Sequence, residues 1–315
     1  MPHTLTHAEG DRALTNPLTG IGWLLRQAIR NEVMQPIRRQ LFSHKSSPFA
    51  FSTRDGYVFV LHPGEYIDSV VFVDGMYERR FVDLVKNYWR GHPGAVALDV
   101  GAHIGLLAIY LSDCFSRVIC FDPNPLAVQR LRENIALNQL RNIEVHAVGL
   151  SDKYAQLPFR IRPHNLGASR FQSDSDEGTM ALPVVIGDDY LEGLHSPQVD
   201  FIKVDVEFHE PEVFCGLRRT IARCRPVVAF EWHGNVVGQE RFDTLAEALP
   251  GYMFVEPIHG PASTRLIDKA KWKIRHQGVP VLRLFERPER RLYENILALP
   301  NQEALASLLA TNGRH

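Results

Sequence analysis

The spacing of hydrophobic positions changes along the chain. Near the N-terminus, apolar residues in 18–33 recur at helical spacing, which predicts an amphipathic arm. Residues 49–73 alternate loosely and contain two turn signals, which predicts short antiparallel strands. A helix is expected at 78–89, closed by Gly91. These patterns divide the first part of the chain into a helical arm (1–47) and a small β/α cap (48–90).

From residue 95 onward, strand-like apolar runs alternate with helical patterns. Strands are expected at 95–100, 117–121, 143–148, 199–206, 226–230 and 252–255, with helices at 105–112, 125–138, 211–222 and 239–249. This alternation predicts a doubly wound α/β domain, a mostly parallel sheet with helices on both faces. An excursion at 156–186 predicts a hairpin inserted beside the mouth of a site. We expect the domain to span 91–295, followed by a C-terminal helix or tail at 296–315.

Composition narrows the classes of function. The 315 residues contain 35 Lys+Arg and 36 Asp+Glu, for a net charge of -1, whereas proteins that neutralise many phosphates are normally basic. We therefore expect no nucleic-acid partner. The four cysteines lack CxxC spacing and are typical of thiols in a reducing compartment. Because neither a signal peptide nor an apolar run of ~20 residues is evident, we expect a cytoplasmic protein without a membrane span.

The first strand of the alternating region ends in a glycine turn that follows a carboxylate. Asp99 would repel a dinucleotide pyrophosphate, and the GxGxxG pattern of nicotinamide enzymes is not present. The GxxxG spacing instead allows a ligand to approach the backbone closely. A cationic, phosphate-free ligand fits this combination, and S-adenosylmethionine is the obvious one. The candidate cofactor residues here are Asp99, Gly101, Ala102 and Gly105.

The next two strands end in further polar residues. Asp122 ends the second strand and lies 21 residues after Gly101, the spacing at which a carboxylate accepts hydrogen bonds from ribose hydroxyls. Asn124 follows it, and Ser151 with Asp152 would lie beside the adenine. The alternative is that the acidic residues cap helix N-termini and that 149–152 is a plain surface turn.

The fourth strand is followed by the densest group of ionisable residues. Asp205, Glu207, His209 and Glu210 crowd its carboxyl end, where burial and like charge perturb pKa values. The fifth strand adds Glu231 and His233 at the same edge of the sheet. The alternative is that these carboxylates cap helices, above all Glu210, which opens the next one.

These segments together resemble one known family. ALDVGAHIG (97–105), FDPNP (121–125), ENIALN (133–138), GLSD (149–152) and IKVDVEFHE (202–210) are closely similar to the FkbM family of S-adenosylmethionine-dependent O-methyltransferases. The segment 66–72 with Tyr77 and Glu78 also resembles the region that precedes the nucleotide site in that family. The resemblance covers about 66–233. In two departures, Phe208 stands where the family usually has glycine, and Asp122 where it commonly has glutamate.

The resemblance implies a Rossmann-like methyltransferase sheet and methyl transfer to a hydroxyl. A general base must then take up the acceptor proton: His209 is the first candidate and His233 the second. Asp205 would hold the acceptor hydroxyl or the methionine ammonium, with Glu207, Phe208 and Glu231 on the substrate side. We expect no metal, although Asp205, Glu207 and His209 could bind Mg²⁺ in an alternative scheme.

Two other functions stay open: a non-catalytic S-adenosylmethionine-binding protein, and a nucleic-acid methyltransferase, although DVEFHE replaces the Asn/Asp-Pro-Pro-aromatic turn of the latter. The resemblance leaves a sugar, a lipid-linked glycan or a polyketide as acceptor. Residues 261–292 carry nine positive and three negative charges. They predict either a solvated face or a funnel for an anionic acceptor, with Trp272 to stack on a sugar ring. The N-terminal arm either packs on the domain or forms a homodimer or membrane-surface contact.

Overall fold

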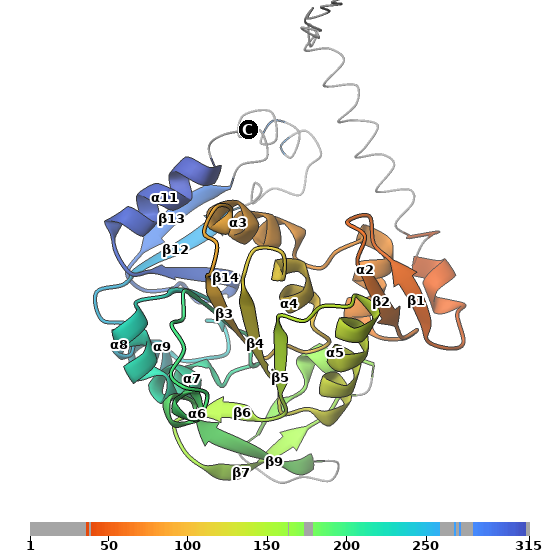
Figure 1. Ribbon diagram of the computed structural model, residues 1–315, viewed down its shortest axis with the longest axis horizontal. Helices are drawn as coiled ribbons and strands as arrows, with labels where there is room; N and C mark the ends of the chain where they lie inside the picture. Colours follow the sequence, from red (N-terminus) through yellow and green to blue (C-terminus); the bar gives the residue numbers. More distant parts are fainter. Residues whose placement is uncertain are drawn as a thin grey trace, which may run out of the picture.

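A mostly parallel sheet forms the centre of the protein (Figure 1). The computed structural model describes residues 36–37, 39–162, 164–172, 179–258, 268, 271 and 280–312. Its largest sheet has the order β13-β12-β14-β11-β10-β3-β4-β5. The parallel strands are β3 (Val96–Val100), β4 (Arg117–Phe121), β5 (Ile143–His146), β10 (Phe201–Val204) and β11 (Val227–His233). The expected doubly wound α/β fold is confirmed.

The other side of this sheet is antiparallel. It contains β12 (Met253–Ile258), β13 (Val281–Phe285) and β14 (Leu292–Leu299). β14 comes last along the chain but lies between β11 and β12 and is antiparallel to both. The domain boundary expected after residue 295 falls inside β14, which runs on to Leu299. The residues from Asn295 to Leu299 are all buried. In the part of the chain that the structure describes, α11 (Gln302–Asn312) follows β14.

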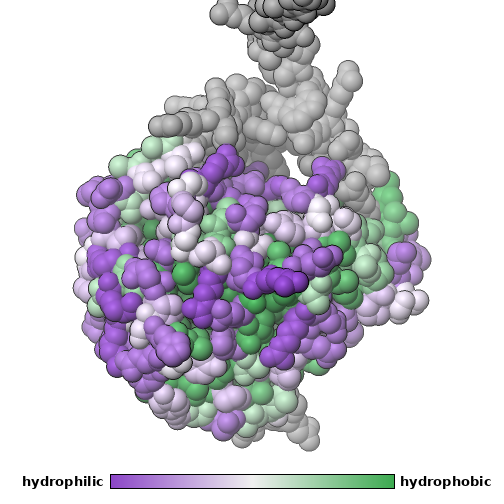
Figure 2. All heavy atoms as spheres, viewed as in Figure 1, coloured by the Kyte–Doolittle hydropathy of each residue, from purple (hydrophilic) through white to green (hydrophobic). Residues whose placement is uncertain are grey.

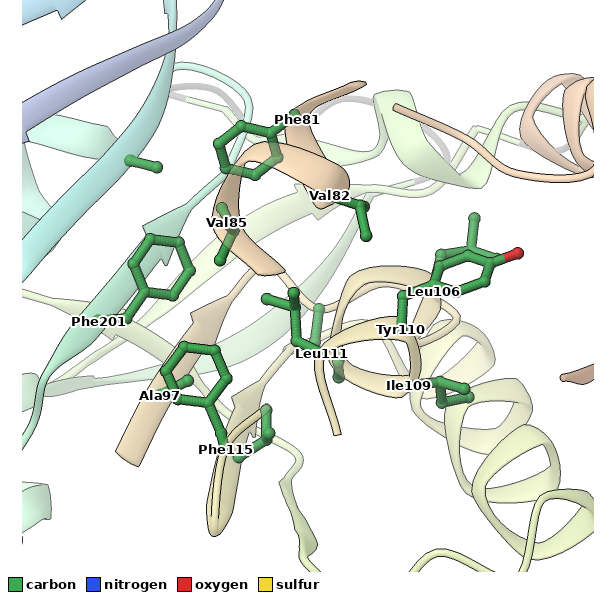
Figure 3. Close-up of a cluster of buried hydrophobic side chains, with 14 of the residues drawn as sticks. Phe81, Val82, Val85, Ala97, Leu106, Ile109, Tyr110, Leu111, Phe115 and Phe201 are labelled. Carbon is green, nitrogen blue, oxygen red and sulfur yellow. The ribbon is translucent and has the colours of Figure 1, made fainter. Parts of the chain in front are cut away.

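Helices cover both faces of the sheet, and successive strand residues contribute to opposite hydrophobic cores. One face carries α3 (Arg79–Trp89), α4 (Leu106–Leu111), α5 (Pro125–Leu137) and α11. Figure 3 shows part of this core, with Phe81 and Val85 of α3 beside Phe201 of β10. The other face carries α6 (Gly187–Gly193), α7 (Glu210–Gly216), α8 (Arg218–Cys224) and α9 (Gln239–Glu247). Among the described residues, no helix is long and apolar enough to cross a membrane.

Two expected elements differ in the structure. The helix predicted at 211–222 is two helices, α7 and α8, because the chain bends at the buried Leu217. In the cap, the expected strands β1 (Phe49–Ser52) and β2 (Val58–Leu61) form a hairpin. The apolar run after them is a helix, α2 (Tyr66–Asp74), and not a strand. Its Asp68 is buried against Arg130 of α5, so tertiary contacts override the β-propensity of its valines.

The interruption of the alternating pattern is a second sheet with the order β6-β9-β7-β8. Its strands are β6 (Gly149–Ser151), β7 (Ala155–Arg160), β8 (Arg170–Phe171) and β9 (Thr179–Ile186), with a short turn of helix, η1 (Leu166–Ala168). β7 and β9 are antiparallel, which confirms the expected hairpin. The predicted arm at 18–33, and with it the predicted homodimer contact, lies outside the described residues.

Candidate active site

Two cavities adjoin at the carboxyl edge of the parallel strands. The first, the β4-side cavity, has a volume of about 540 Å³ and lies between the ends of β3 and β4 and the inserted sheet. The second, the α3-side cavity, has a volume of about 880 Å³ and lies between α2, the start of α3 and the ends of β3, β10 and β11. They share the lining residues Gly101, His103, Gly167, Asp205 and Glu207. Two ligands bound here would therefore touch at the ends of β3 and β10.

The turn after β3 requires glycine at position 101. Gly101 has φ +90°, and a Cβ there would lie 1.8 Å from the carbonyl oxygen of Asp205. No other residue fits so close to β10 without moving it. The amides of Gly101 and Ala102 both donate to the carbonyl of Phe121, at 2.8 and 3.1 Å, so the turn is fixed to the end of β4.

Asp122 organises the loops around the β4-side cavity. Its two carboxylate oxygens accept hydrogen bonds from the amides of His103 and Asn124, each at 2.8 Å. Burial raises the pKa of Asp122 to about 6. The cap of α5 is Asn124, whose side chain accepts from the amide of Leu126 at 3.1 Å. Each Asp122 oxygen keeps one further lone pair in a residue that lines the cavity.

His209 also belongs to the β4-side cavity. Its Nε2 lies 3.0 Å from the hydroxyl of the fully buried Ser151, which contacts Asp152 at 3.2 Å. Its Nδ1 lies 3.7 Å from Glu212. Burial lowers the pKa of His209. Ser151 and Asp152 therefore position this imidazole, and the structure groups it with the lining residues of the β4-side cavity.

Alternation along the strands brings a polar cluster into the α3-side cavity. Asp99, Lys203 and Glu231 have the same parity as Ala97, Phe201 and Ala229, which pack in the core beneath α3. Lys203 lies opposite Asp99 in the sheet register, and its Nζ is 3.3 Å from Asp205. Burial lowers the pKa of Lys203, but the carboxylates of Asp205, Glu78 and Glu231 outweigh it, so the net shift is upward.

The carboxyl groups around Lys203 are held at high pKa values. Burial raises the pKa of Asp99, Glu78 and Glu207 to about 7 each and raises that of Glu231. Glu78, at the start of α3, accepts a hydrogen bond from the Asn295 amide of β14 at 2.9 Å. Oδ2 of Asp99 is buried without a hydrogen-bond partner among the described residues. Such groups gain from a cation or a hydroxyl donor.

The loop after β10 keeps a left-handed backbone despite its phenylalanine. Glu207 has φ +52° and Phe208 φ +80°. The Glu210 carboxyl accepts the amides of Val206 and Phe208 at 3.3 and 3.2 Å, so it holds the loop before α7, whereas the alternative for this residue was that it caps the helix. Burial raises the pKa of Glu210 to about 8. Position 208 therefore has the left-handed backbone that the glycine usual in the family would favour, although phenylalanine occupies it here.

The ring of Phe208 does not lie alone at the site. The Arg170 guanidinium is 4.8 Å from its centroid, and the His233 ring is 4.6 Å away. Nε2 of His233 lies 3.3 Å from Glu231, and this interaction raises the pKa of His233. Glu231 lines the α3-side cavity. A carboxylate and an imidazole thus lie together at the α3-side cavity.

Several residues of the α3-side cavity were not predicted as site residues: Tyr66, Tyr77, Glu78, His103 and Lys203. The sequence does indicate Lys203, because it is a charged residue within an apolar strand and its side chain is expected on the same face of the sheet as that of Asp99. Tyr66 and Tyr77 are contributed by the cap, and only the family resemblance of their segment pointed to them. His103 has φ +51° and a buried, unpartnered Nε2 among the described residues, and burial lowers its pKa to about 3.

Most of the basic segment at 261–292, Trp272 included, lies outside the described residues. Four of its arginines are described, and three of these form ion pairs. Arg283 and Arg291 contact Glu256 and Glu289, and Arg287 contacts Asp243 at 3.2 Å. These pairs are typical of a solvated face and do not support a funnel for anions.

The donor set fits S-adenosylmethionine. The glycine turn at Gly101 leaves room for close backbone contact, Asp122 has lone pairs free for ribose hydroxyls, and the orphaned carboxylate oxygen of Asp99 suits a cationic group. Among the described residues, no group of three or more His, Cys, Asp or Glu side chains is arranged to hold a metal ion.

The fold and the paired cavities define a Rossmann-like α/β protein of the methyltransferase type. Residues 99–255 match the methyltransferase FkbM domain, and the chain belongs to this family. The resemblance seen in the sequence is thereby confirmed.

Three curated relatives are similar to parts of this chain. The chain is 32% identical over 153 residues to the hexuronic acid methyltransferase AglP of Haloferax volcanii. This alignment covers 49% of this chain and 62% of AglP. It is 34% identical over 254 residues to the AMB antimetabolite synthetase AmbE of Pseudomonas aeruginosa, covering 66% of this chain and 11% of AmbE. It is 24% identical over 198 residues to the 2-O-methyltransferase NoeI of Sinorhizobium fredii, covering 56% of this chain and 78% of NoeI.

Proposed function

We propose that this protein is an S-adenosylmethionine-dependent O-methyltransferase that acts on a hydroxyl of a sugar or glycan. The observation that carries the proposal is the junction of the two cavities at Gly101 and Asp205. It allows a cofactor in one cavity and an acceptor in the other to touch. The printed functions of AglP and NoeI, a hexuronic acid methyltransferase and a 2-O-methyltransferase, support an oxygen of a sugar as the acceptor atom.

The β4-side cavity supplies the groups that would hold the cofactor. Asp122 would accept hydrogen bonds from the ribose. The carboxyl of Asp205, which lines both cavities, would face the positive charge together with that of Asp99, which lines the adjoining α3-side cavity. When bound, S-adenosylmethionine supplies an electrophilic methyl group. The protein's own contribution is then to align the acceptor oxygen and to exclude water, which is the larger part of such catalysis.

The acceptor proton must go to a group of the α3-side cavity. An alcohol is too weak an acid to ionise unaided, so a base is needed at the oxygen. Glu231 lines that cavity and lies 3.3 Å from His233. We assign this pair to proton uptake, because the carboxylate stabilises the imidazolium as the proton arrives. His209 is hydrogen-bonded to Ser151 on the other side of the site. In this proposal it has a structural role as part of the wall of the β4-side cavity.

Methyl transfer from labelled S-adenosylmethionine to a panel of glycosides and glycan extracts tests the proposal. We expect acceptor-dependent formation of S-adenosylhomocysteine, lost in Asp122→Ala and kept in Glu133→Gln, an exposed position on α5 that serves as the matched control. Calorimetric binding of the cofactor without turnover on any hydroxyl acceptor would favour the non-catalytic alternative. Absence of cofactor binding in the wild type would refute both.

A further inference from the structure

The loop after β10 holds one bulky side chain in a fixed place. The amide of Phe208 donates to the Glu210 carboxyl at 3.2 Å, and its carbonyl accepts from the guanidinium of Arg241 at 3.0 Å. Arg241 is itself held by Glu212 at 2.7 Å. The backbone between these contacts is left-handed, with φ +80°, a conformation that costs an L-residue free energy and costs glycine almost none. The chain therefore keeps a phenylalanine where the backbone alone would favour glycine.

Phe208 lies outside both cavities, because it is not among the residues that line either of them. It is half-buried and packs against the core of the sheet face that carries α6 to α9. Figure 2 shows a face of the molecule that is mostly hydrophilic, with hydrophobic side chains gathered toward its middle, and a partly exposed phenylalanine in a loop departs from that pattern. Its ring contacts Arg170 at 4.8 Å and His233 at 4.6 Å. We therefore look for its role in these two neighbours.

The imidazole of His233 is oriented by packing more than by hydrogen bonding. Its Nε2 is buried and lies 3.3 Å from Glu231, without the alignment of a hydrogen bond among the described residues. The Phe208 ring lies at 54° to the plane of the imidazole. An aromatic ring at such a short distance restricts the orientation of its neighbour and stabilises a cation beside it. The ring thus both fixes the place of the imidazole and favours its protonated form.

We propose that Phe208 is a positioning residue for proton uptake, and that its ring holds the imidazole of His233 beside the carboxylate of Glu231. The proposal rests on the proposed function, which assigns proton uptake to this pair. A base gains strength when its protonated form is stabilised, and Glu231 raises the pKa of His233. A ring that keeps the two groups together preserves that effect.

A change of the ring leaves the charges around His233 in place. They come from the elements packed around it: Glu231 of β11, Glu207 after β10, Glu210 of α7, Arg170 of β8 and Arg291 beside Gly234. The three carboxyls raise the pKa of the imidazole, and the guanidinium on the Phe208 ring opposes them by like charge. Since Phe208→Leu keeps these charges, most of the bulk and the left-handed backbone, it removes the aromatic character alone.

The titration of His233 in the full chain tests the proposal without any substrate. It is followed by NMR with isotope-labelled histidine, and His233→Ala identifies the signal. We expect Phe208→Leu to lower the pKa of His233 by about 0.5 pH units and to lower kcat about tenfold. The pH at which the rate rises should move down with this pKa. Phe208→Tyr, which restores the ring, should recover the pKa and kcat.

Phe171 offers a matched control. Its ring is 5.4 Å from the imidazole of His209, at 50° to it, so Phe171→Leu removes a similar contact from the other imidazole. It should leave the pKa of His233 unchanged. If Phe208→Leu does not fold, Phe208→Gly, which removes the backbone cost, takes its place and should lower kcat at least as far.

An unchanged pKa of His233 in Phe208→Leu, or an unchanged kcat beside a shifted pKa, would overturn the positioning role. The assignment of the base fails in a different way, since His233→Ala would then keep full turnover. Absence of methyl transfer in the wild type would refute the proposed function, and the NMR titration, which needs no substrate, would still decide whether Phe208 holds this imidazole.

Discussion

Replacement of Phe208 by glycine and by alanine should reverse the usual order of stability. Phe208 has φ +80°, a region that costs an L-residue about 1–2 kcal/mol and costs glycine almost nothing. Both variants lose the ring that packs beside Arg170 and His233. That loss is on the order of 1–3 kcal/mol for a partly buried aromatic side chain. Phe208→Ala carries this cost and keeps the strained backbone.

The expected difference between the two variants follows from opposing terms. Glycine relieves the strain but loses about 0.5–1 kcal/mol through the greater freedom of its unfolded chain. Phe208→Gly should therefore be more stable than Phe208→Ala by about 0.5–1 kcal/mol. For a chain of this length that is a difference in Tm of about 1–3 °C.

Urea unfolding of both variants, followed by circular dichroism, measures this difference. The matched control is Phe171 in β8, which touches His209 with its ring and has an extended backbone. There the alanine variant should be the more stable of the two. If Phe208→Ala proves at least as stable as Phe208→Gly, the left-handed conformation of this loop is wrong.

Four further predictions concern the site and its charge. Asp122→Ala should weaken S-adenosylmethionine by about 1.5–3 kcal/mol, as for a lost charged hydrogen bond, and calorimetry that finds unchanged affinity would contradict its ribose contact. His233→Ala should lower turnover by about 10²-fold, whereas His209→Ala should act mainly on cofactor affinity. In the wild type the rate should rise with pH through an ionisation above 6.5, because Glu231 raises the pKa of His233. Between about pH 6.5 and 8 the free energy of unfolding should fall as pH rises, because the folded chain holds protons that the unfolded chain has released; a rise would contradict the raised pKa values of Asp99, Glu78, Glu207 and Glu210.

The parallel half of the sheet could be predicted because its signals are local. Each of its strands is a short apolar run bounded by a turn, and parallel strands place their carboxyl ends at one edge. The proximity of Asp99, Gly101 and Asp205 follows from that rule and is observed. The role of His209 could not be separated from that of His233 in the same way. The place of His209 in the β4-side cavity depends on its contact with Ser151, 58 positions away.

The part of the α3-side cavity wall that Glu78 forms escaped prediction because its contacts are distant in sequence. Glu78 and Asn295 are separated by 217 positions, and no local pattern connects them. A strand was predicted where the helix Tyr66–Asp74 lies, because the valines of this segment favour strands. The sequence alone does not show that Asp68 is buried against Arg130. Phe208 shows the reverse case, in which packing and the Glu210 carboxyl hold a backbone that the residue type disfavours.

The insertion of β14 between β11 and β12 imposes an order on biosynthesis. The ribosome releases β12 and β13 before β14. These two strands can pair with each other but cannot join the main sheet in their final positions until β14 is present, because β14 lies between β12 and β11. β14 also delivers Asn295 to Glu78. The wall of the α3-side cavity is thus completed only when β14 has been translated, whereas the β3 turn and Asp122 emerge much earlier. During synthesis, the residues of the β4-side cavity are therefore available before the α3-side cavity can close.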